Sequence, residues 1–260
     1  MDGTECNNNC DNDNGNYSKL DDSTITRGLN HIQYALCNTP SGSHSIFVYS
    51  DIRILRATYP TYIKSLLEDN EIVLILTYYD HPSMVRQLLE VGNKKNSSTD
   101  IEEYLHDGSL LIVDSLMTYL NPVQNSQMNI DNNDNNGDKT NFLSLLRMLL
   151  NHGIKNNKKG ITILSDMGSF FHHSNGHKYN NNTDSKDIIH TIHNIMEFER
   201  SIPSGYKNLE LKKFCLYHQK DYESHFASKR QKAQLLDCHG RSILIMDGNN
   251  NHNDNDNIMQ

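Results

Sequence analysis

The chain has 260 residues, a formal net charge of −8 and a hydrophobic fraction of only 36%, with no tryptophan. This length is enough for one large domain or two small ones with a buried core. The acidic balance argues against direct nucleic-acid binding, because phosphate contacts require a basic face. No stretch approaches the roughly 20 consecutive apolar residues of a membrane-spanning helix, so we expect no membrane insertion.

The cysteines and the first residues indicate a reducing compartment. Five cysteines, an odd number, are scattered along the chain, which disfavours a disulfide framework. The sequence begins MDGTEC and continues with asparagine, so it shows neither the basic start nor the apolar stretch of a signal peptide. We therefore expect free thiols and a cytoplasmic location.

Four segments are rich in asparagine and aspartate and have little apolar surface to bury. They are residues 1–24, 122–140, 172–187 and 248–260. Such compositions do not offset the entropy of ordering, so we predict a disordered leader, a disordered tail and two insertions into surface loops. The apolar segments on both sides of the insertions form one continuous series. This predicts a single domain over residues 25–247.

Short β-rich runs alternate with helical patterns along that series. The six predicted strands are Ser45–Tyr49, Ile72–Tyr78, Leu110–Val113, Ile161–Leu164, Lys213–Tyr217 and Ser242–Met246. Several of these runs are continuously apolar, as in strands that are covered on both faces. The predicted helices are residues 55–67, 85–89, 142–150 and 188–196, with a weaker stripe at 226–236. The alternation predicts an α/β fold in three layers, a mainly parallel six-stranded sheet with helices on both faces.

Residues at or near the strand ends are the candidate ligand-binding residues, because open parallel sheets bind ligands beyond their carboxyl ends. They are His44, Tyr49, Asp80, Asp114, Asp166 and Tyr217. His44 precedes the first strand, so the opposite edge of the sheet is its alternative position. Each aspartate has an alternative role as a helix cap or turn residue, and the two tyrosines have one as core residues.

The strand that ends at Asp166 resembles the strand that holds Mg²⁺ in phosphate-loop enzymes. That chemistry also requires a Gly-x-x-x-x-Gly-Lys-Ser/Thr loop after the first strand, where this chain reads SDIRILR. The chain has no Gly-x-Ser-x-Gly elbow, and its His and Cys residues lack convincing metal-ligand spacing. We expect no enzyme activity, metal or cofactor. The alternative is an atypical nucleotide-binding protein or ATPase remnant that uses Asp114 and Asp166.

Segments from about Gly42 to Asp247, taken in order, resemble the MEDS family, the methanogen/methylotroph sensory domain. The opening GSHSIFVY is similar to the family's Gly-x-His-x-x-x-x-Tyr start. KFCLYHQKD is similar to its Cys-x-Tyr-Asp strand end, EFE to its Tyr-Glu helix end, and the stretch around His239 to its closing helix and strand. The chain departs from the family in its two Asn-rich insertions and at Asp166, where the family commonly has a Gly-Glu-Met-like triplet.

The resemblance implies a RecA/KaiC-like fold without a working phosphate-binding loop. It implies a non-catalytic sensory or regulatory domain in signal transduction that binds a small, apolar ligand, a protein partner or both. Such domains occur beside histidine kinases or DNA-binding domains, so the expected partner is a histidine kinase or a transcription regulator. A third interpretation is a purely structural interaction module with a filled pocket. The sequence indicates no particular oligomeric state.

Overall fold

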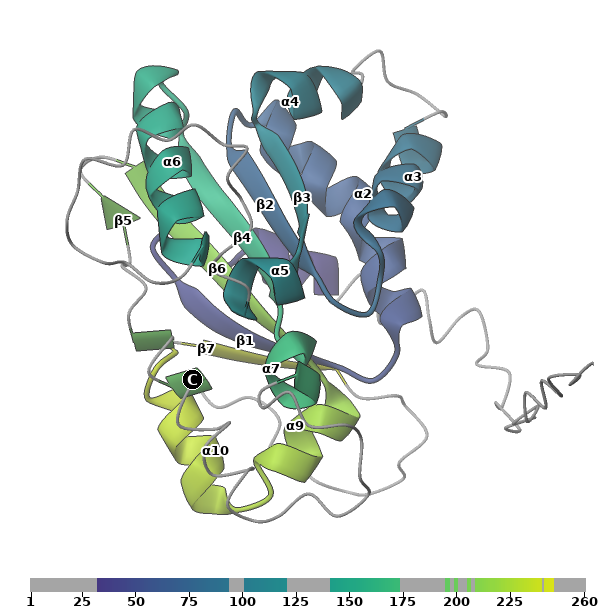
Figure 1. Ribbon diagram of the computed structural model, residues 1–260, viewed down its shortest axis with the longest axis vertical. Helices are drawn as coiled ribbons and strands as arrows, with labels where there is room; N and C mark the ends of the chain where they lie inside the picture. The colour runs from purple at the N-terminus through teal and green to yellow at the C-terminus, as the bar shows by residue number, and fades with distance from the viewer. Residues whose placement is uncertain are drawn as a thin grey trace, which may run out of the picture.

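The computed structural model describes residues 32–93, 101–120, 141–173, 195–196, 199–200, 205–206, 209–239 and 241–245. Strands and helices alternate along these ranges (Figure 1). The strands are β1 (His44–Tyr49), β2 (Ile72–Thr77), β3 (Leu110–Asp114), β4 (Gly160–Asp166), β5 (Gly205–Tyr206), β6 (Leu209–His218) and β7 (Arg241–Ile245). The labelled helices are α2 (Ile52–Glu68), α3 (Pro82–Asn93), α4 (Ile101–Asp107), α5 (Ser115–Leu120), α6 (Asn141–Lys155), α7 (Gly168–His173), α9 (Gln219–His225) and α10 (Lys229–Leu236), and residues 32–37 are also helical.

The described strands form one sheet in the order β3-β2-β4-β6-β1-β7, and β5 pairs with β6. Every pair along this path is parallel, whereas β5 is antiparallel to β6. The prediction of an α/β fold with a mainly parallel sheet is therefore confirmed. The number of strands differs, because the described sheet has seven strands rather than six. The additional strand, β5, has only two residues and is too short to give an apolar pattern.

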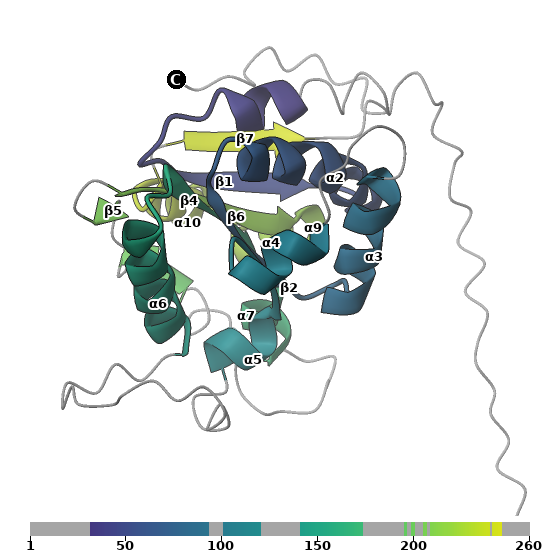
Figure 2. The ribbon, with the colours of Figure 1, turned by 90° about the horizontal axis from the view of Figure 1, so that it is seen from above.

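Helices cover both faces of the sheet, which explains why β2 and β4 are continuously buried. Residues 32–37, α2, α3 and α4 pack on one face, and α5, α6, α7 and α10 pack on the other. Alternate residues of each strand enter the two cores. In β1, Phe47 and Tyr49 face α2, whereas Ile46 and Val48 face the opposite core. Figure 2 shows the helices on both sides of the sheet.

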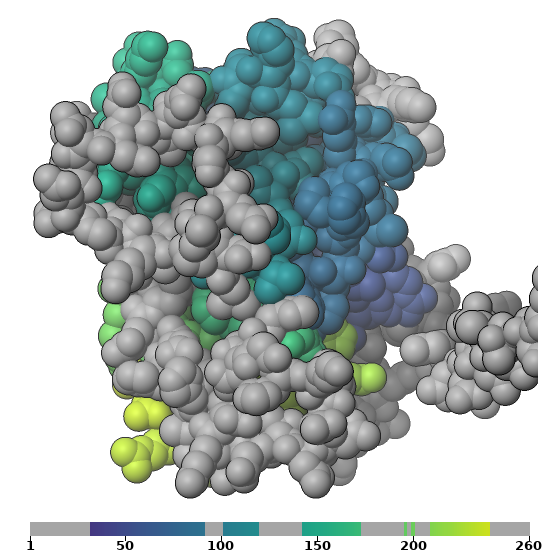
Figure 3. Space-filling model, in the orientation of Figure 1, coloured from purple at the N-terminus to yellow at the C-terminus, as the bar shows by residue number. Residues whose placement is uncertain are grey.

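Side chains of α3, α4 and α6 form the surface at one end of the molecule, and those of α10 lie at the other end (Figure 3). Among the residues that the structure describes, no helix combines the length and the apolar character needed to cross a bilayer.

Several predicted segments differ from the structure in their bounds or lie outside the described residues. The segment predicted as an insertion at 172–187 begins inside α7, whose last residues are His172 and His173, because the aromatic residues before them anchor this turn to the core. The stripe at 226–236 is interrupted, because α9 ends at His225 and a capping box formed by Ser228 and Gln231 starts α10. The predicted segments 1–24, 122–140 and 248–260 lie outside the described residues, as do residues 174–187.

A substitution at Gly168 tests how closely α7 packs on the end of β2. A Cβ atom at this position would overlap the Tyr78 ring and lie 2.9 Å from Tyr79 Cε2. We expect Gly168→Ala to lower the free energy of unfolding by about 1–3 kcal/mol, because the rings must move. Urea denaturation measures this change.

The matched control is Ser169→Ala in the same turn. The Ser169 hydroxyl is buried and has no hydrogen-bond partner among the described residues, so its removal should cost little or nothing. Equal stabilities of the two variants would contradict the packing described here.

Candidate functional site

Asp166 joins the carboxyl ends of two neighbouring strands. It is the last residue of β4, and its Oδ2 accepts hydrogen bonds from the backbone N–H groups of Tyr78 and Tyr79, both at 3.3 Å, just after β2. Its Oδ1 accepts a third bond from Gly168 N at 2.9 Å. Burial raises the pKa of Asp166 to about 7, although the three amides act in the opposite direction. Both oxygens of this carboxyl group are thus engaged within the protein.

A polar and aromatic network lies beside Asp166 at the same edge of the sheet. The Tyr79 hydroxyl donates to the carboxylate of Asp221 in α9 and lies 3.1 Å from His172 Nε2. His172 Nε2 is also 3.3 Å from Asp221 Oδ1, and its ring stacks on Tyr78 at a centroid distance of 5.6 Å. Burial raises the pKa of Asp221, but the bonds from His172 and Tyr79 outweigh burial and leave this pKa below its usual value. The network therefore connects β2, α7 and α9.

Tyr49, at the end of β1, contributes an unpaired hydroxyl to this region. Its side chain is fully buried, and its hydroxyl has no hydrogen-bond partner among the described residues. Burial raises the pKa of Tyr49 well above its usual value, and the charges of Asp166 and Asp221 raise it further. The ring meets His218 edge-on at a centroid distance of 5.4 Å. A buried hydroxyl without a partner is a group that a ligand atom could satisfy.

Two of the predicted site aspartates have structural partners. Both carboxylate oxygens of Asp80 accept bonds from Arg56 Nε in α2, at 3.2 and 3.1 Å. Asp114 caps α5, because its Oδ1 accepts a bond from Met117 N at 3.0 Å. For Asp114 the geometry is the helix cap that the sequence offered as the alternative role.

The remaining two predicted site residues lie elsewhere. Tyr217 enters the core on the opposite face of the sheet from Tyr49, where Phe226 and Tyr222 pack against its ring. His44 is the first residue of β1, and therefore lies at the opposite end of that strand from Tyr49. The predicted residues thus do not form one group. Tyr49, Asp80 and Asp166 lie in one region of the carboxyl edge, because Asp166 raises the pKa of Tyr49, and Asp166 and Asp80 both raise the pKa of the buried Tyr59.

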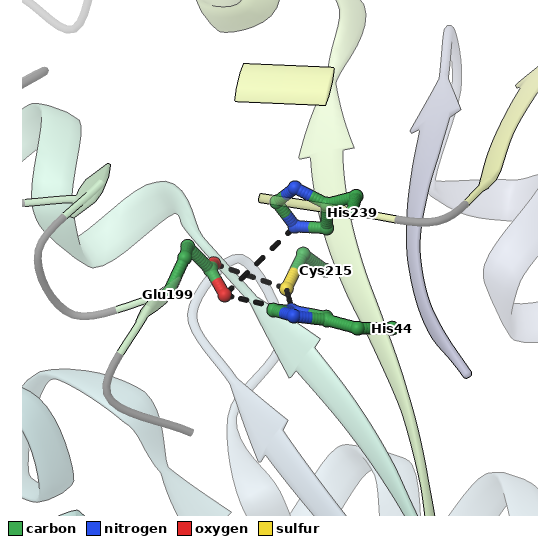
Figure 4. Close-up of side chains that lie close together, drawn as sticks. All are labelled: His44, Glu199, Cys215 and His239. Carbon is green, nitrogen blue, oxygen red and sulfur yellow. Dashed lines mark hydrogen bonds and ion pairs between the residues drawn. The ribbon is translucent and has the colours of Figure 1, made fainter. Parts of the chain in front are cut away.

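His44 belongs to a second group of side chains, which was not predicted. Its Nε2 lies 2.8 Å from Glu199 Oε2 and 3.1 Å from Cys215 Sγ (Figure 4). Cys215 Sγ donates to Glu199 Oε1 at 3.0 Å, and His239 Nε2 lies 3.8 Å from Glu199 Oε2. These four residues, His44, Glu199, Cys215 and His239, are called the HECH cluster below. Each offers one donor atom, and the four atoms lie within 4.8 Å of one another.

Lys213 places a positive charge beside the HECH cluster. Its Nζ lies 2.9 Å from Glu199 Oε2, and both side chains are almost fully buried. Burial alone would raise the pKa of Glu199, but Lys213, His44 and His239 outweigh burial and lower this pKa strongly. Burial raises the pKa of the Cys215 thiol and lowers that of His239 to about 4. At neutral pH the cluster therefore holds an ionised carboxylate, a protonated thiol and a neutral His239.

Sequence spacing could not reveal the HECH cluster, since its members come from β1, residues 199–200, β6 and the turn after α10. All four nevertheless lie in segments that carry the resemblance to the MEDS family. A search of protein-family models found no match to the chain, and a search of curated proteins found no significant match either. Membership of that family therefore stays a prediction.

The raised pKa of Asp166 predicts a specific pH dependence of stability. In the unfolded chain this group ionises near pH 3.8, whereas in the folded protein it ionises near pH 7. Between these values the folded state binds more protons, so the contribution of Asp166 to stability falls as pH rises from about 4 to about 7. The expected total loss is roughly 4 kcal/mol, at about 1.4 kcal/mol for each pKa unit.

Asp166→Asn removes the ionisable group and should remove this contribution. The variant should be less stable at low pH, because its amide NH₂ meets backbone N–H donors. The informative quantity is the difference in stability between parent and variant, measured by urea denaturation from pH 4 to pH 7.5. A difference that is constant over this range would show that Asp166 titrates normally. Asp114→Asn makes the same carboxylate-to-amide change at the cap of α5 and is the control.

Proposed function

We propose that this protein is a non-catalytic sensory or regulatory domain on a RecA/KaiC-like scaffold that lacks a phosphate-binding site. The observation that carries this proposal is the occupancy of the carboxyl edge of the sheet by the chain's own carboxylates and aromatic rings. In this proposal the domain works in the cytoplasm, binds a small neutral ligand near Tyr49 and signals through a protein partner, a histidine kinase or a transcription regulator.

The N-terminus of α2 supports the lack of a phosphate site. In nucleotide-binding sheets of this kind, the free N–H groups and positive dipole end of the first helix hold the phosphates. Here the Asp51 carboxylate caps α2 by accepting from Arg53 N at 2.8 Å, and it also binds Arg53 Nε at 2.7 Å. A carboxylate in this position repels a phosphate, and it occupies an amide that a phosphate would need.

The contacts of the two remaining acids weaken the alternative function, a nucleotide-binding remnant that uses Asp114 and Asp166. Three backbone amides bind Asp166, and Asp114 caps α5. A Mg²⁺ ion would have to displace these bonds. It would also have to deprotonate a buried carboxyl group whose pKa is about 7. Neither acid is therefore prepared to hold Mg²⁺.

The groups near Tyr49 favour a small neutral ligand. Tyr49 offers a buried hydroxyl, and Tyr79, His172 and His218 add aromatic surface with polar edges. Burial lowers the pKa of His218, so its ring is neutral at pH 7. Asp221 provides negative charge that disfavours anions. A short-chain alcohol or ketone is neutral and carries a single polar group that could bond the Tyr49 hydroxyl.

Ligand binding can be tested by removing only the unpaired hydroxyl of Tyr49. A panel of ATP with Mg²⁺ and short-chain alcohols, ketones and amines would be screened by thermal shift, and affinities measured by calorimetry. We expect no micromolar binding or hydrolysis of ATP. We expect Tyr49→Phe to weaken the binding of a small ligand about 3- to 10-fold, the value of one hydrogen bond.

The matched control is Tyr62→Phe. Tyr62 is another buried tyrosine without a hydroxyl partner among the described residues, but it lies near Glu71 and Cys37 instead of the carboxyl edge. Both variants should be as stable as the parent, and only Tyr49→Phe should bind less well. ATP turnover that disappears in Asp166→Asn would overturn the proposal in favour of the nucleotide-binding alternative. A panel without any binder would leave the structural interaction module as the better description.

A further inference from the structure

We propose that the HECH cluster binds one divalent transition-metal ion, with Zn²⁺ as the ion that its donors fit best. The four donor atoms are two imidazole nitrogens, one carboxylate oxygen and one sulfur, all within 4.8 Å of one another. Figure 4 shows that the four side chains point toward one another from separate parts of the chain. This site lies apart from the carboxyl-edge site of the proposed function and does not depend on it.

The hydrogen bond of His239 prepares its ring for a metal ion. Its Nδ1 lies 2.7 Å from the backbone oxygen of Leu235, which can only accept, so Nδ1 carries the proton. Nε2 therefore has a free lone pair. In metal sites a ligating histidine commonly donates its other N–H to a backbone carbonyl in this way, which fixes the tautomer and the ring orientation.

The free lone pair of His239 faces another electron-rich atom. Nε2 is buried, has no hydrogen-bond partner among the described residues and lies 3.8 Å from Glu199 Oε2. Two acceptor atoms that face each other at this distance repel unless a proton or a cation lies between them. A metal ion bound by both atoms would replace this repulsion with attraction.

The spacing of the donors suits a tetrahedral ion after a small expansion. Bonds of about 2.0–2.3 Å place neighbouring donors of a tetrahedral Zn²⁺ roughly 3.3–3.8 Å apart. Here His44 Nε2 lies 2.8 Å from Glu199 Oε2 and 3.1 Å from Cys215 Sγ, and His239 Nε2 lies at 3.8 Å from Glu199 Oε2. Side-chain shifts of about half an ångström would separate the close pairs, and the pairs that lie up to 4.8 Å apart would have to approach the ion.

The same geometry argues against a nucleophilic cysteine. In a catalytic cysteine–histidine–acid arrangement, one imidazole nitrogen faces the thiol and the other faces the carboxylate. Here a single atom, His44 Nε2, contacts both Cys215 and Glu199. The Cys215 side chain is also fully buried, so a substrate could not reach its sulfur.

Lys213 is compatible with a metal ion, because a carboxylate has two oxygens. Lys213 Nζ binds Glu199 Oε2, whereas Oε1 accepts from the Cys215 thiol. When an ion replaces the thiol proton, which leaves to water, Oε1 is freed and the ion can bind either oxygen of the carboxylate. His44 is the most exposed of the four side chains, at 17%, and marks the side from which an ion could enter. Four protein ligands leave no open position, so the ion would fix structure or report metal concentration instead of performing catalysis.

Co²⁺ is a direct probe of this site, because it binds as Zn²⁺ does and absorbs visible light. The full chain, freed of metal by chelation, would be titrated with Co²⁺ and then with Zn²⁺. We expect one equivalent of Co²⁺ to give intense four-coordinate bands and a thiolate-to-cobalt charge-transfer band, and one equivalent of Zn²⁺ to abolish both. Thermal melting should shift upward with Zn²⁺.

Variants locate the bound ion. Cys215→Ser should lose the charge-transfer band, and His239→Gln should weaken binding by more than about tenfold, since loss of even a partner of a ligand costs 10- to 100-fold. Cys37→Ser removes an exposed thiol, and His106→Gln an exposed imidazole at the end of α4; both should bind as the parent does. Circular dichroism at the titration temperature confirms that each variant is folded.

Three outcomes would overturn the proposal. One is an unchanged Co²⁺ spectrum in Cys215→Ser. Another is loss of the band in Cys37→Ser, which would place the ion at the exposed thiol. The third is a parent protein that gives only the weak bands of six-coordinate Co²⁺. If Cys215→Ser does not fold, His239→Gln decides the question. It retains the thiol, so it should keep the charge-transfer band but bind Co²⁺ with lower affinity.

Discussion

The buried lysine in the central strand is the constraint on which much of this structure depends. Lys213 lies in β6, between β4 and β1, with 1% of its side chain exposed. A charge in such a position persists only with a partner, and loss of the partner of a buried pair costs about 3–5 kcal/mol. Glu199 is that partner, so the segment that contains it must pack against the sheet. This requirement brings the carboxylate to His44, Cys215 and His239.

Strands β1 and β6 provide the common frame for both groups of side chains. They are parallel and in register, with His44 opposite Lys213 and Tyr49 opposite His218. The HECH cluster therefore lies toward the amino end of β1, and the aromatic network lies at its carboxyl end. Tyr49 and Cys215 face opposite cores, although His172 of the network lies in α7, which packs on the same face as Cys215. The two groups are thus kept apart mainly by the length of the strands.

The sequence predicts the strands well where burial on both faces produces continuous apolar runs, as in β2 and β4. It predicts β6 less well, from 213 to 217 instead of Leu209–His218, because Lys212 and Lys213 interrupt the apolar pattern although both are buried. Lys212 is paired across the sheet with Glu71, at 3.6 Å. Pairing partners far apart in the sequence make these lysines tolerable in the core, and a local pattern cannot show them.

Predicting the candidate site requires the strand register, whereas predicting the fold class does not. Tyr49 and Tyr217 both end a predicted strand, which placed them together. Tyr49 does end β1, but Tyr217 lies one residue before the end of β6 at His218. In the structure Tyr217 is opposite Val48 rather than Tyr49, so the two rings point to different faces. A shift of one residue in the register of β1 and β6 would bring both rings to one face. No local pattern in the sequence shows which register forms. The proximity of the four HECH residues could not be predicted for the same reason, because it arises only after β1 and β6 pair.

The acids at the carboxyl edge have partners among the described residues of the chain. Asp51 caps α2, Asp166 ties β4 to β2, and Asp80 pairs with Arg56. Each acid is satisfied by donors from the chain itself, so little donor capacity is left for a phosphate and little acceptor capacity for a magnesium ion.

The buried polar atoms without a partner among the described residues at this edge are hydroxyls, above all that of Tyr49. A hydroxyl can both donate and accept a hydrogen bond, so it can pair with a neutral alcohol or carbonyl group. Its burial also favours ligands whose remaining surface is apolar, since any further polar group would have to give up water without a partner. These properties of the edge are those on which the proposal of a small, neutral ligand depends.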